Sequence, residues 1–156
     1  LAALKAGESA NLADMFFGFT PGVIGETSAA LLLAGGLFLL VRKVISWEIP
    51  VIYIGTVAVF VLLFGGHGMD FYYVACEICG GGLMLGAFFM ATDYVTSPIT
   101  FKGRILYAVL IGVLTGVFRI FGNMAEGVSF AIIIGNILVP LIEKATLPKA
   151  FGREGK

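Results

Sequence analysis

The sequence predicts an all-α polytopic membrane protein with about five transmembrane helices. Of its 156 residues, 59% are hydrophobic and only 13% are charged, whereas soluble domains are roughly half apolar and about one quarter charged. Apolar runs long enough to approach a bilayer crossing recur five times. Ten basic residues balance ten acidic ones, so the composition indicates neither a nucleic-acid-binding surface nor an acidic tail.

Five apolar ranges are expected to be the membrane-crossing helices. Each begins after turn-forming or polar residues and ends at polar or basic ones, as helices do. The ranges are approximately 23–41, 50–64, 71–90, 105–121 and 128–142. The second and the fifth are shorter than the about 20 residues of a straight crossing. They are therefore expected either to extend into flanking residues or to be partly broken.

The basic residues predict the orientation of the chain. With five crossings, alternate connections share one side of the membrane, and that side carries eight of the ten Lys and Arg residues. Because cytoplasmic loops are enriched in basic residues, we expect residues 144–156 to form a basic cytoplasmic tail after a helix bundle at 23–143. Residues 1–22 are expected to form an amphipathic segment on the extracytoplasmic side that leads into the first membrane helix. The eight cations are Arg42, Lys43, Lys102, Arg104, Lys144, Lys149, Arg153 and Lys156.

Glycine spacing predicts where helices approach each other closely. The chain contains 22 Gly residues, about twice the average share. Gly82 and Gly86 are four positions apart, and so are Gly112 and Gly116, which would place small residues on one helix face. Glycine is so frequent here that either pair could also arise by chance.

The polar start of the first apolar range is a candidate binding site, made of Gly25, Glu26, Thr27 and Ser28. Backbone N–H groups at a helix start donate hydrogen bonds to a capping side chain, and they also bind phosphate and other anions. Glu26 is therefore either a helix cap or part of a polar cradle for an anionic or flavin-type ligand. Arg119 is a candidate counter-charge on the same side of the membrane.

Glu77 is a candidate ion-coupling residue inside the range 71–90. An ionisable side chain within a membrane needs a partner or a function, so Glu77 either extends outward to water or relays a proton or cation. Cys76 and Cys79 flank it. A redox or iron–sulfur site needs either a strand–turn context or two further thiolates, and the sequence provides neither here. We interpret both cysteines as small hydrophobic filler.

Asp93 is the stronger ion-coupling candidate, together with Thr96 and Ser97. These oxygen-bearing side chains surround a proline at the cytoplasmic boundary, so they either satisfy the backbone of a loop or coordinate a hard cation. Arg119 forms a similar polar group with Asn123 and Glu126, for which an Arg–Glu ion pair is the simple structural explanation.

The sequence lacks the motifs of a hydrolase or nucleotidase that would act on its own. It has no Ser-His-Asp spacing, Walker motif or His-Glu-x-x-His. His67 is the one histidine, lies among glycines, and is interpreted as a solvated loop residue rather than a metal ligand. We expect no metal site, and any chemistry would come from a cofactor or a partner.

Several stretches, in the same order, resemble one family of membrane proteins. The stretches are residues 21–28 (PGVIGETS), 45–50 (ISWEIP), 81–93 (GGLMLGAFFMATD) and 95–98 (VTSP). They are similar to the D subunit of the Rnf ion-translocating electron-transport complex. The B subunit of the Na⁺-translocating NADH:quinone oxidoreductase is a more distant match. The likeness covers the C-terminal half of that family, so the resemblance implies that the chain is half of a larger two-repeat subunit.

The resemblance implies a flavoprotein subunit in the inner (cell) membrane of a prokaryote. Family members carry FMN joined through its phosphate to a Thr that would lie just upstream of Leu1, and riboflavin is a second flavin to consider. The implied partners are the other membrane and redox subunits of the complex, the lipid bilayer, and Na⁺ or H⁺.

The resemblance and the residues together predict a subunit of a redox-driven ion pump, a ferredoxin:NAD⁺ oxidoreductase that is not catalytic alone. In this interpretation the flavin lies near the outer membrane surface. The alternatives are the membrane domain of a channel or small-solute transporter, because polar residues on short helices also suit a substrate path, and a purely structural membrane anchor.

Overall fold

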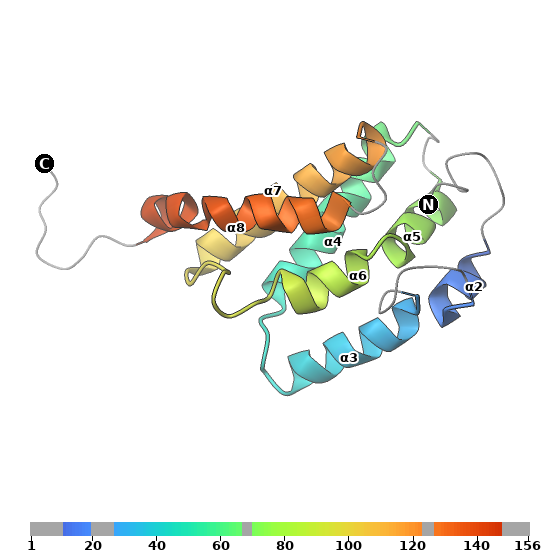
Figure 1. Cartoon of the computed structure of the whole chain (residues 1–156), viewed down its shortest axis with the longest axis horizontal. Coiled ribbons are helices and arrows are strands. Elements are labelled where there is room, and N and C mark those ends of the chain that lie inside the picture. Colours follow the sequence, from blue (N-terminus) through green and yellow to red (C-terminus); the bar gives the residue numbers. More distant parts are fainter. Residues whose placement is uncertain (1–10, 20–26, 67–69, 123–126, 148–156) are drawn as a thin grey trace, which may run out of the picture.

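A computed structural model describes residues 11–19, 27–66, 70–122 and 127–147. All of the regular secondary structure in these ranges is helical (Figure 1). The elements are α2 (Leu12–Phe17), α3 (Ala29–Val41), α4 (Glu48–Phe64), α5 (Phe71–Cys79), α6 (Leu83–Leu85), the π-helix η1 (Gly86–Met90), α7 (Phe101–Ile120) and α8 (Gly127–Thr146). The all-helical membrane fold expected from the sequence is confirmed.

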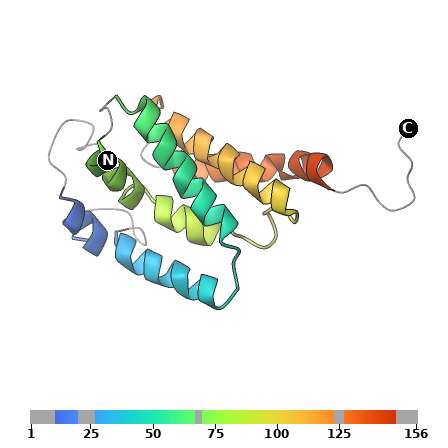
Figure 2. The same ribbon diagram turned by 180° about the vertical axis from the view of Figure 1, so that it is seen from behind.

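The centre of the structure is helix α7, which packs along both α4 and α8 (Figures 1 and 2). Gly112 and Gly116 face α4, and a Cβ atom added at either position would overlap Thr56 or Phe60. Small residues at this spacing let two helix backbones approach closely. The predicted close contact at Gly112 and Gly116 is therefore present, and it belongs to the α4–α7 interface.

The range 71–90 is not the single straight helix that hydropathy predicts. It bends by 65° between α5 and the segment formed by α6 and η1. Gly81 and Gly82 at the bend have φ values of 62° and 69°, in the left-handed region that glycine adopts without steric cost. Gly82 and Gly86 consequently do not form a stripe on one continuous helix, although Gly86 does contact Val128 of α8.

The two short predicted ranges extend into their flanking residues instead of breaking. Helix α4 begins two positions before 50, and α8 runs on to Thr146 with Pro140 inside it. Among the described helices, α7 and α8 are long and apolar enough to cross a membrane, and the bent pair is a third span if counted as one. Helices α3 and α4 are apolar but have 13 and 17 residues.

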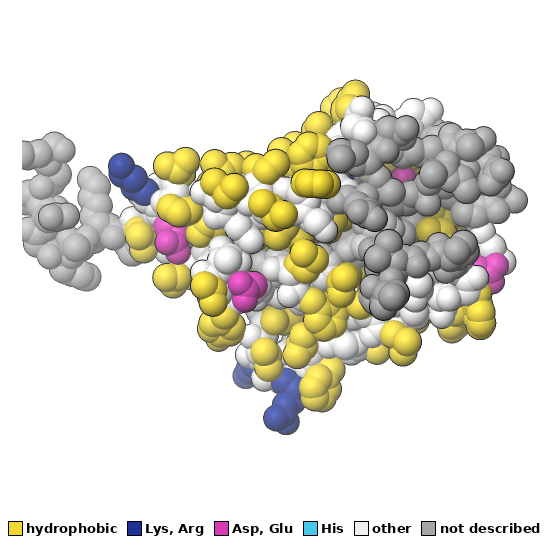
Figure 3. All heavy atoms as spheres, viewed as in Figure 1, with side chains coloured by type: hydrophobic (Ala, Val, Ile, Leu, Met, Phe, Trp, Pro, Cys, Tyr) yellow, Lys and Arg dark blue, Asp and Glu magenta, His cyan; other side chains and the backbone are white. Residues whose placement is uncertain are grey.

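The surface of the described helices is strongly apolar. Large hydrophobic side chains such as Leu31, Leu63 and Ile137 are 70–75% exposed, and yellow side chains cover much of the face in Figure 3. A soluble protein rarely exposes so much contiguous apolar surface, whereas lipid tails or neighbouring membrane helices cover it without cost. The fold therefore fits a membrane environment.

Candidate functional site

The most deeply buried charged group of the described chain is an ion pair at the broken helix. Arg119 of α7 is 1% exposed and Glu77 of α5 is 2% exposed. One guanidinium nitrogen of Arg119 lies 3.2 Å from Oε2 of Glu77 and donates to the Glu77 backbone carbonyl. The other terminal nitrogen donates to the carbonyls of Gly80 (2.9 Å) and Gly81 (3.0 Å). Arg119 thus joins α7 to the last turn of α5 and to the first residues of the bend.

The interruption of the helix between α5 and α6 explains why a positively charged side chain lies here. The last carbonyls of a helix have no partner within it and carry partial negative charge. Inside a membrane, water does not satisfy such groups, so irregular backbone persists only where protein supplies donors. Arg119 supplies a planar set of donors together with a positive charge. Glu77 balances that charge, so this part of the interior is close to neutral.

Further polar side chains lie on the same stripe of α7 as Arg119. Arg104, Tyr107, Thr115 and Arg119 are separated by three, eight and four positions, which places them on one helix face together with Ile111. At about 1.5 Å per residue the stripe is about 22 Å long. It therefore spans most of a bilayer's hydrocarbon core, which is about 30 Å thick.

Two hydrogen bonds connect the middle of this stripe to the neighbouring helices. The hydroxyl of Tyr53 on α4 lies 2.7 Å from that of Thr115, and both residues are fully buried. Tyr107 donates to Oδ1 of Asn136 on α8 at 2.6 Å. Because residue 140 is proline, it has no N–H to donate to the Asn136 carbonyl four positions earlier. Hydroxyl and carbonyl oxygens are thus concentrated between the two ends of α7.

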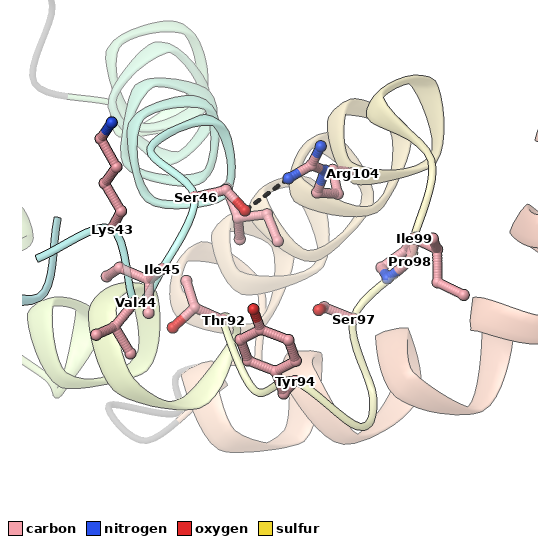
Figure 4. A pocket seen from close by; sticks show the side chains of 11 residues that line it. Lys43, Val44, Ile45, Ser46, Thr92, Tyr94, Ser97, Pro98, Ile99 and Arg104 are labelled. Atoms are coloured by element: carbon pink, nitrogen blue, oxygen red, sulfur yellow. Dashed lines mark hydrogen bonds between the residues drawn. The ribbon is translucent and has the colours of Figure 1, made fainter.

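The far end of the stripe is a second polar group at the start of α4 and α7. Arg104 donates to Oγ of Ser46 at 2.6 Å (Figure 4), and it lies 3.6 Å from a carboxylate oxygen of Glu48. Arg104 and Ser46 border a cavity of about 370 Å³ that is also lined by Thr92 and Ser97. The two polar groups therefore lie at opposite ends of the α4–α7 pair.

The structure separates the predicted ion-coupling residues. Asp93 is exposed in the loop after η1, where it accepts a hydrogen bond from Thr96 at 3.1 Å. Ser97 lines the cavity at this end, whereas Glu77 is buried near the other end of α7. Of the two alternatives for Glu77, extension outward to water does not hold, because the side chain is 2% exposed and is paired with Arg119.

The predicted flavin-binding residues are only partly described. Gly25 and Glu26 lie outside the described residues, as do Asn123, Glu126 and His67. Thr27 is half-buried. Ser28 is the N-cap of α3, accepting from the Leu31 amide at 3.4 Å and donating to the Phe16 carbonyl at 3.4 Å.

An apolar groove lies beside this join between α2 and α3. Its volume is about 540 Å³, and its walls come from α2 and α5. Phe16 connects the two features, since its side chain lines the groove and its carbonyl accepts from Ser28. The residues lining the groove are Leu12, Ala13, Phe16, Phe17, Ala75, Ile78 and Cys79.

Both cysteines are free thiols and pack among apolar side chains, Cys76 being buried and Cys79 half-buried. This agrees with their interpretation as hydrophobic filler. In the described ranges, no group of three or more His, Cys, Asp or Glu residues is placed to hold a metal ion.

Sequence reasoning missed the pairing of Glu77 with Arg119, which are 42 positions apart, and the contact of Arg104 with Ser46 and Glu48. The available signal was the presence of opposite charges inside or beside apolar ranges, since such charges are costly in a membrane unless paired. This signal does not identify which residue is the partner, because the sequence of one helix does not specify its distance from another helix.

These features define a class of protein: a polytopic helical membrane protein with a broken helix and a buried ion pair inside its bundle. Comparison with known proteins identifies the family. Residues 1–152 match the NQR2, RnfD, RnfE family, and the chain belongs to it.

Curated relatives carry closely related names. The D subunit of the Na(+)-translocating ferredoxin:NAD(+) oxidoreductase complex of Acetobacterium woodii is 45% identical, over 97% of this chain and 48% of its own length. Its proton-translocating counterpart from Clostridium ljungdahlii is 46% identical, over 94% of this chain and 44% of its own. The D subunit of the ion-translocating oxidoreductase complex of Stutzerimonas stutzeri is 42% identical, over 93% of this chain and 41% of its own length. The chain thus spans less than half the length of these relatives.

Proposed function

We propose that this chain forms part of the D subunit of an ion-translocating ferredoxin:NAD⁺ oxidoreductase complex in a prokaryotic cell membrane, and that it contributes a path for the transported ion. Membership of the family and the names of the relatives support the assignment to such a complex. The sodium-translocating and proton-translocating relatives are almost equally similar to this chain. The identity of the ion therefore has to come from measurement.

The observation that carries the ion path is the polar stripe of α7 with a buried ion pair at its end. Asp93 lies exposed beside the opposite end, where a carboxylate attracts cations from water. From there the Tyr107–Asn136 and Tyr53–Thr115 pairs offer oxygen ligands or hydroxyl protons within the bundle. Polar groups in a membrane interior are costly, and they commonly mark ion and proton pathways.

Glu77 is the proposed acceptor at the end of the path opposite Asp93. A proton arriving there would neutralise the carboxylate, and Na⁺ would compete with Arg119 for its oxygens. In either case the attraction between Glu77 and Arg119 weakens. Since Arg119 also holds the Gly80 and Gly81 carbonyls, occupancy of Glu77 is coupled to the conformation of the broken helix. This gives the ion a direct mechanical effect on the backbone.

The experiment compares ion uptake with electron transfer in membrane vesicles that contain the whole complex. We expect Asp93→Asn and Tyr53→Phe to lower ion uptake more than ferredoxin-dependent NAD⁺ reduction. Glu143→Gln is the matched control, because its carboxylate accepts from the Ile99 amide on the same side of the bundle but lies off the stripe. Equal loss of both activities in Asp93→Asn, with no loss in the control, would instead assign Asp93 a structural role.

The proposed cofactor is a flavin on the side of the chain where α2 and α3 meet. The described residues fit the two parts of FMN unequally. The apolar groove beside Ser28 suits a flat aromatic ring, and Phe16 and Phe17 lie on its wall. Ser28 is already engaged in capping, and Arg119 is occupied by α5, so the described part of the chain provides no phosphate cradle. This agrees with a phosphate attached outside it. A bound flavin would supply the one-electron and two-electron chemistry.

The absorbance spectrum of the purified intact protein tests the flavin directly. A flavin band that persists after denaturation and precipitation is expected for a covalent cofactor. A spectrum without a flavin band would favour the channel, transporter or anchor alternatives.

The orientation follows from the same proposal: the basic ends of α3, α7 and α8 face the cytoplasm. Single cysteines at Lys102 and Phe121, both exposed, test it in a protein lacking Cys76 and Cys79. An impermeant thiol reagent applied to intact cells is expected to label position 121 and not position 102. The reverse pattern would overturn the orientation and the outward placement of the flavin.

A further inference from the structure

The cavity between the start of α4 and the loop after η1 has a composition that the proposed ion path does not explain. Its volume is about 370 Å³. The side chains on its walls include two cations and four hydroxyls, and no carboxylate. The polar lining residues are Lys43, Ser46, Thr92, Tyr94, Ser97 and Arg104. Such a lining is complementary to an anion with several acceptor oxygens.

Three chain segments hold these groups around the cavity: the link between α3 and α4, the loop after η1, and the start of α7 (Figure 4). Ser46 and Arg104 lie on one side, joined by their 2.6 Å hydrogen bond. Tyr94 and Ser97 lie across from them on the loop after η1. Lys43 stands on the rim at the end of α3, where its backbone has a left-handed φ of 55°. Its long side chain can follow a ligand at the cavity mouth.

Arg104 has donor capacity that the described chain does not use. Its Nε atom is buried and has no hydrogen-bond acceptor among the described residues. Glu48, at 3.6 Å, balances its charge without making a hydrogen bond to it. A buried donor without an acceptor destabilises the fold, so an acceptor supplied by a ligand would stabilise this end of α7.

The rim of the cavity is apolar and lies at one end of the helix bundle. Ile99 is 79% exposed and Val44 is 49% exposed at the mouth. Trp47 is 59% exposed next to Ser46, and Trp commonly lies at the level of lipid headgroups. Cations beside exposed apolar side chains match the two parts of a phospholipid, a charged head and acyl chains. A soluble phosphate compound has no acyl chain to contact the apolar side chains at the rim.

We propose that this cavity binds the phosphate headgroup of an anionic phospholipid from the leaflet that faces the basic side of the protein, with Arg104, Ser46 and Ser97 around the phosphate and Lys43 at the mouth. The lipid would brace the starts of α4 and α7 against the loop that carries Asp93. The proposal does not depend on ion transport, because binding is measured without turnover.

The test measures lipid binding to the intact detergent-purified protein by native mass spectrometry. Phosphatidylglycerol and phosphatidylcholine are added separately, and the bound lipid is counted. We expect preference for phosphatidylglycerol, and a loss of about fivefold in affinity for Lys43→Gln and again for Arg104→Gln. Lys144→Gln is the matched control, because Lys144 is an exposed cation in the last turn of α8 and does not line the cavity.

Two further arms keep the proposal falsifiable. Arg104→Gln also removes the Glu48 ion pair, so Lys43→Gln with Ser97→Ala provides a variant that leaves this pair intact. Inorganic phosphate and glycerol 3-phosphate are added as competitors to separate a lipid headgroup from a free anion. Equal binding of the two lipids, equal weakening by Lys144→Gln, or displacement of phosphatidylglycerol by the soluble phosphates at matching concentration would each overturn the proposal.

Discussion

Replacement of Arg119 is the most informative test of how the broken helix is held. Arg119→Gln removes the charge that faces the Glu77 carboxylate and at least one of the three contacts to the Glu77, Gly80 and Gly81 carbonyls. Removing one partner of a buried ion pair costs about 3–5 kcal/mol, because the remaining charge stays buried without compensation. We expect a loss of this size in the free energy of unfolding.

A double-mutant cycle separates the charge from the carbonyl contacts. Glu77→Gln with Arg119→Gln leaves neither charge buried, so the double variant should be less destabilised than the sum of the two single variants by about 0.5–3 kcal/mol. Arg119→Lys keeps the charge but loses the planar fork that contacts two sets of carbonyls. It should therefore remain less stable than the unaltered protein.

The assay is reversible unfolding of the purified protein in mixed micelles of dodecyl maltoside and sodium dodecyl sulfate, followed by circular dichroism. A change below about 1 kcal/mol for Arg119→Gln, far under the buried-pair cost, would refute the reasoning. So would strict additivity of the two single variants, since it would show that Glu77 and Arg119 do not interact energetically.

Two other predictions concern the α4–α7 interface. Gly116→Ala places a methyl group against the Phe60 ring and should cost about 1–3 kcal/mol, whereas Gly55→Ala on α4 meets no atom within 4 Å and should be neutral or stabilising by up to about 1 kcal/mol. Equal effects in the same unfolding assay would contradict the packing argument. Tyr53→Phe leaves the Thr115 hydroxyl without its partner and should cost about 1–3 kcal/mol, and adding Thr115→Val should add little, because both polar groups are then gone. A full additive loss in the double variant would show that the two hydroxyls act independently.

The amino-acid sequence by itself determined the fold class, the positions of the apolar ranges and the resemblance to the family. These properties are local: hydropathy, helix starts and stops, and short motifs depend on neighbouring residues only. The close approach at Gly112 and Gly116 was also visible as a spacing, because residues four apart share a face on any helix. The partner helix was not visible, since the same spacing suits contact with α4, α8 or another chain.

The tertiary structure decided where the chain breaks and which charges meet. Hydropathy does not distinguish a straight helix at 71–90 from one bent at Gly81 and Gly82, because glycine is apolar in both cases and its φ is free. Arg119, which is 42 positions from Glu77, donates hydrogen bonds to the carbonyls at this bend and so helps to stabilise it. The polar stripe of α7 and the basic cavity likewise arise where separate helices face each other, and the free energy of such contacts depends on distances that no single segment encodes.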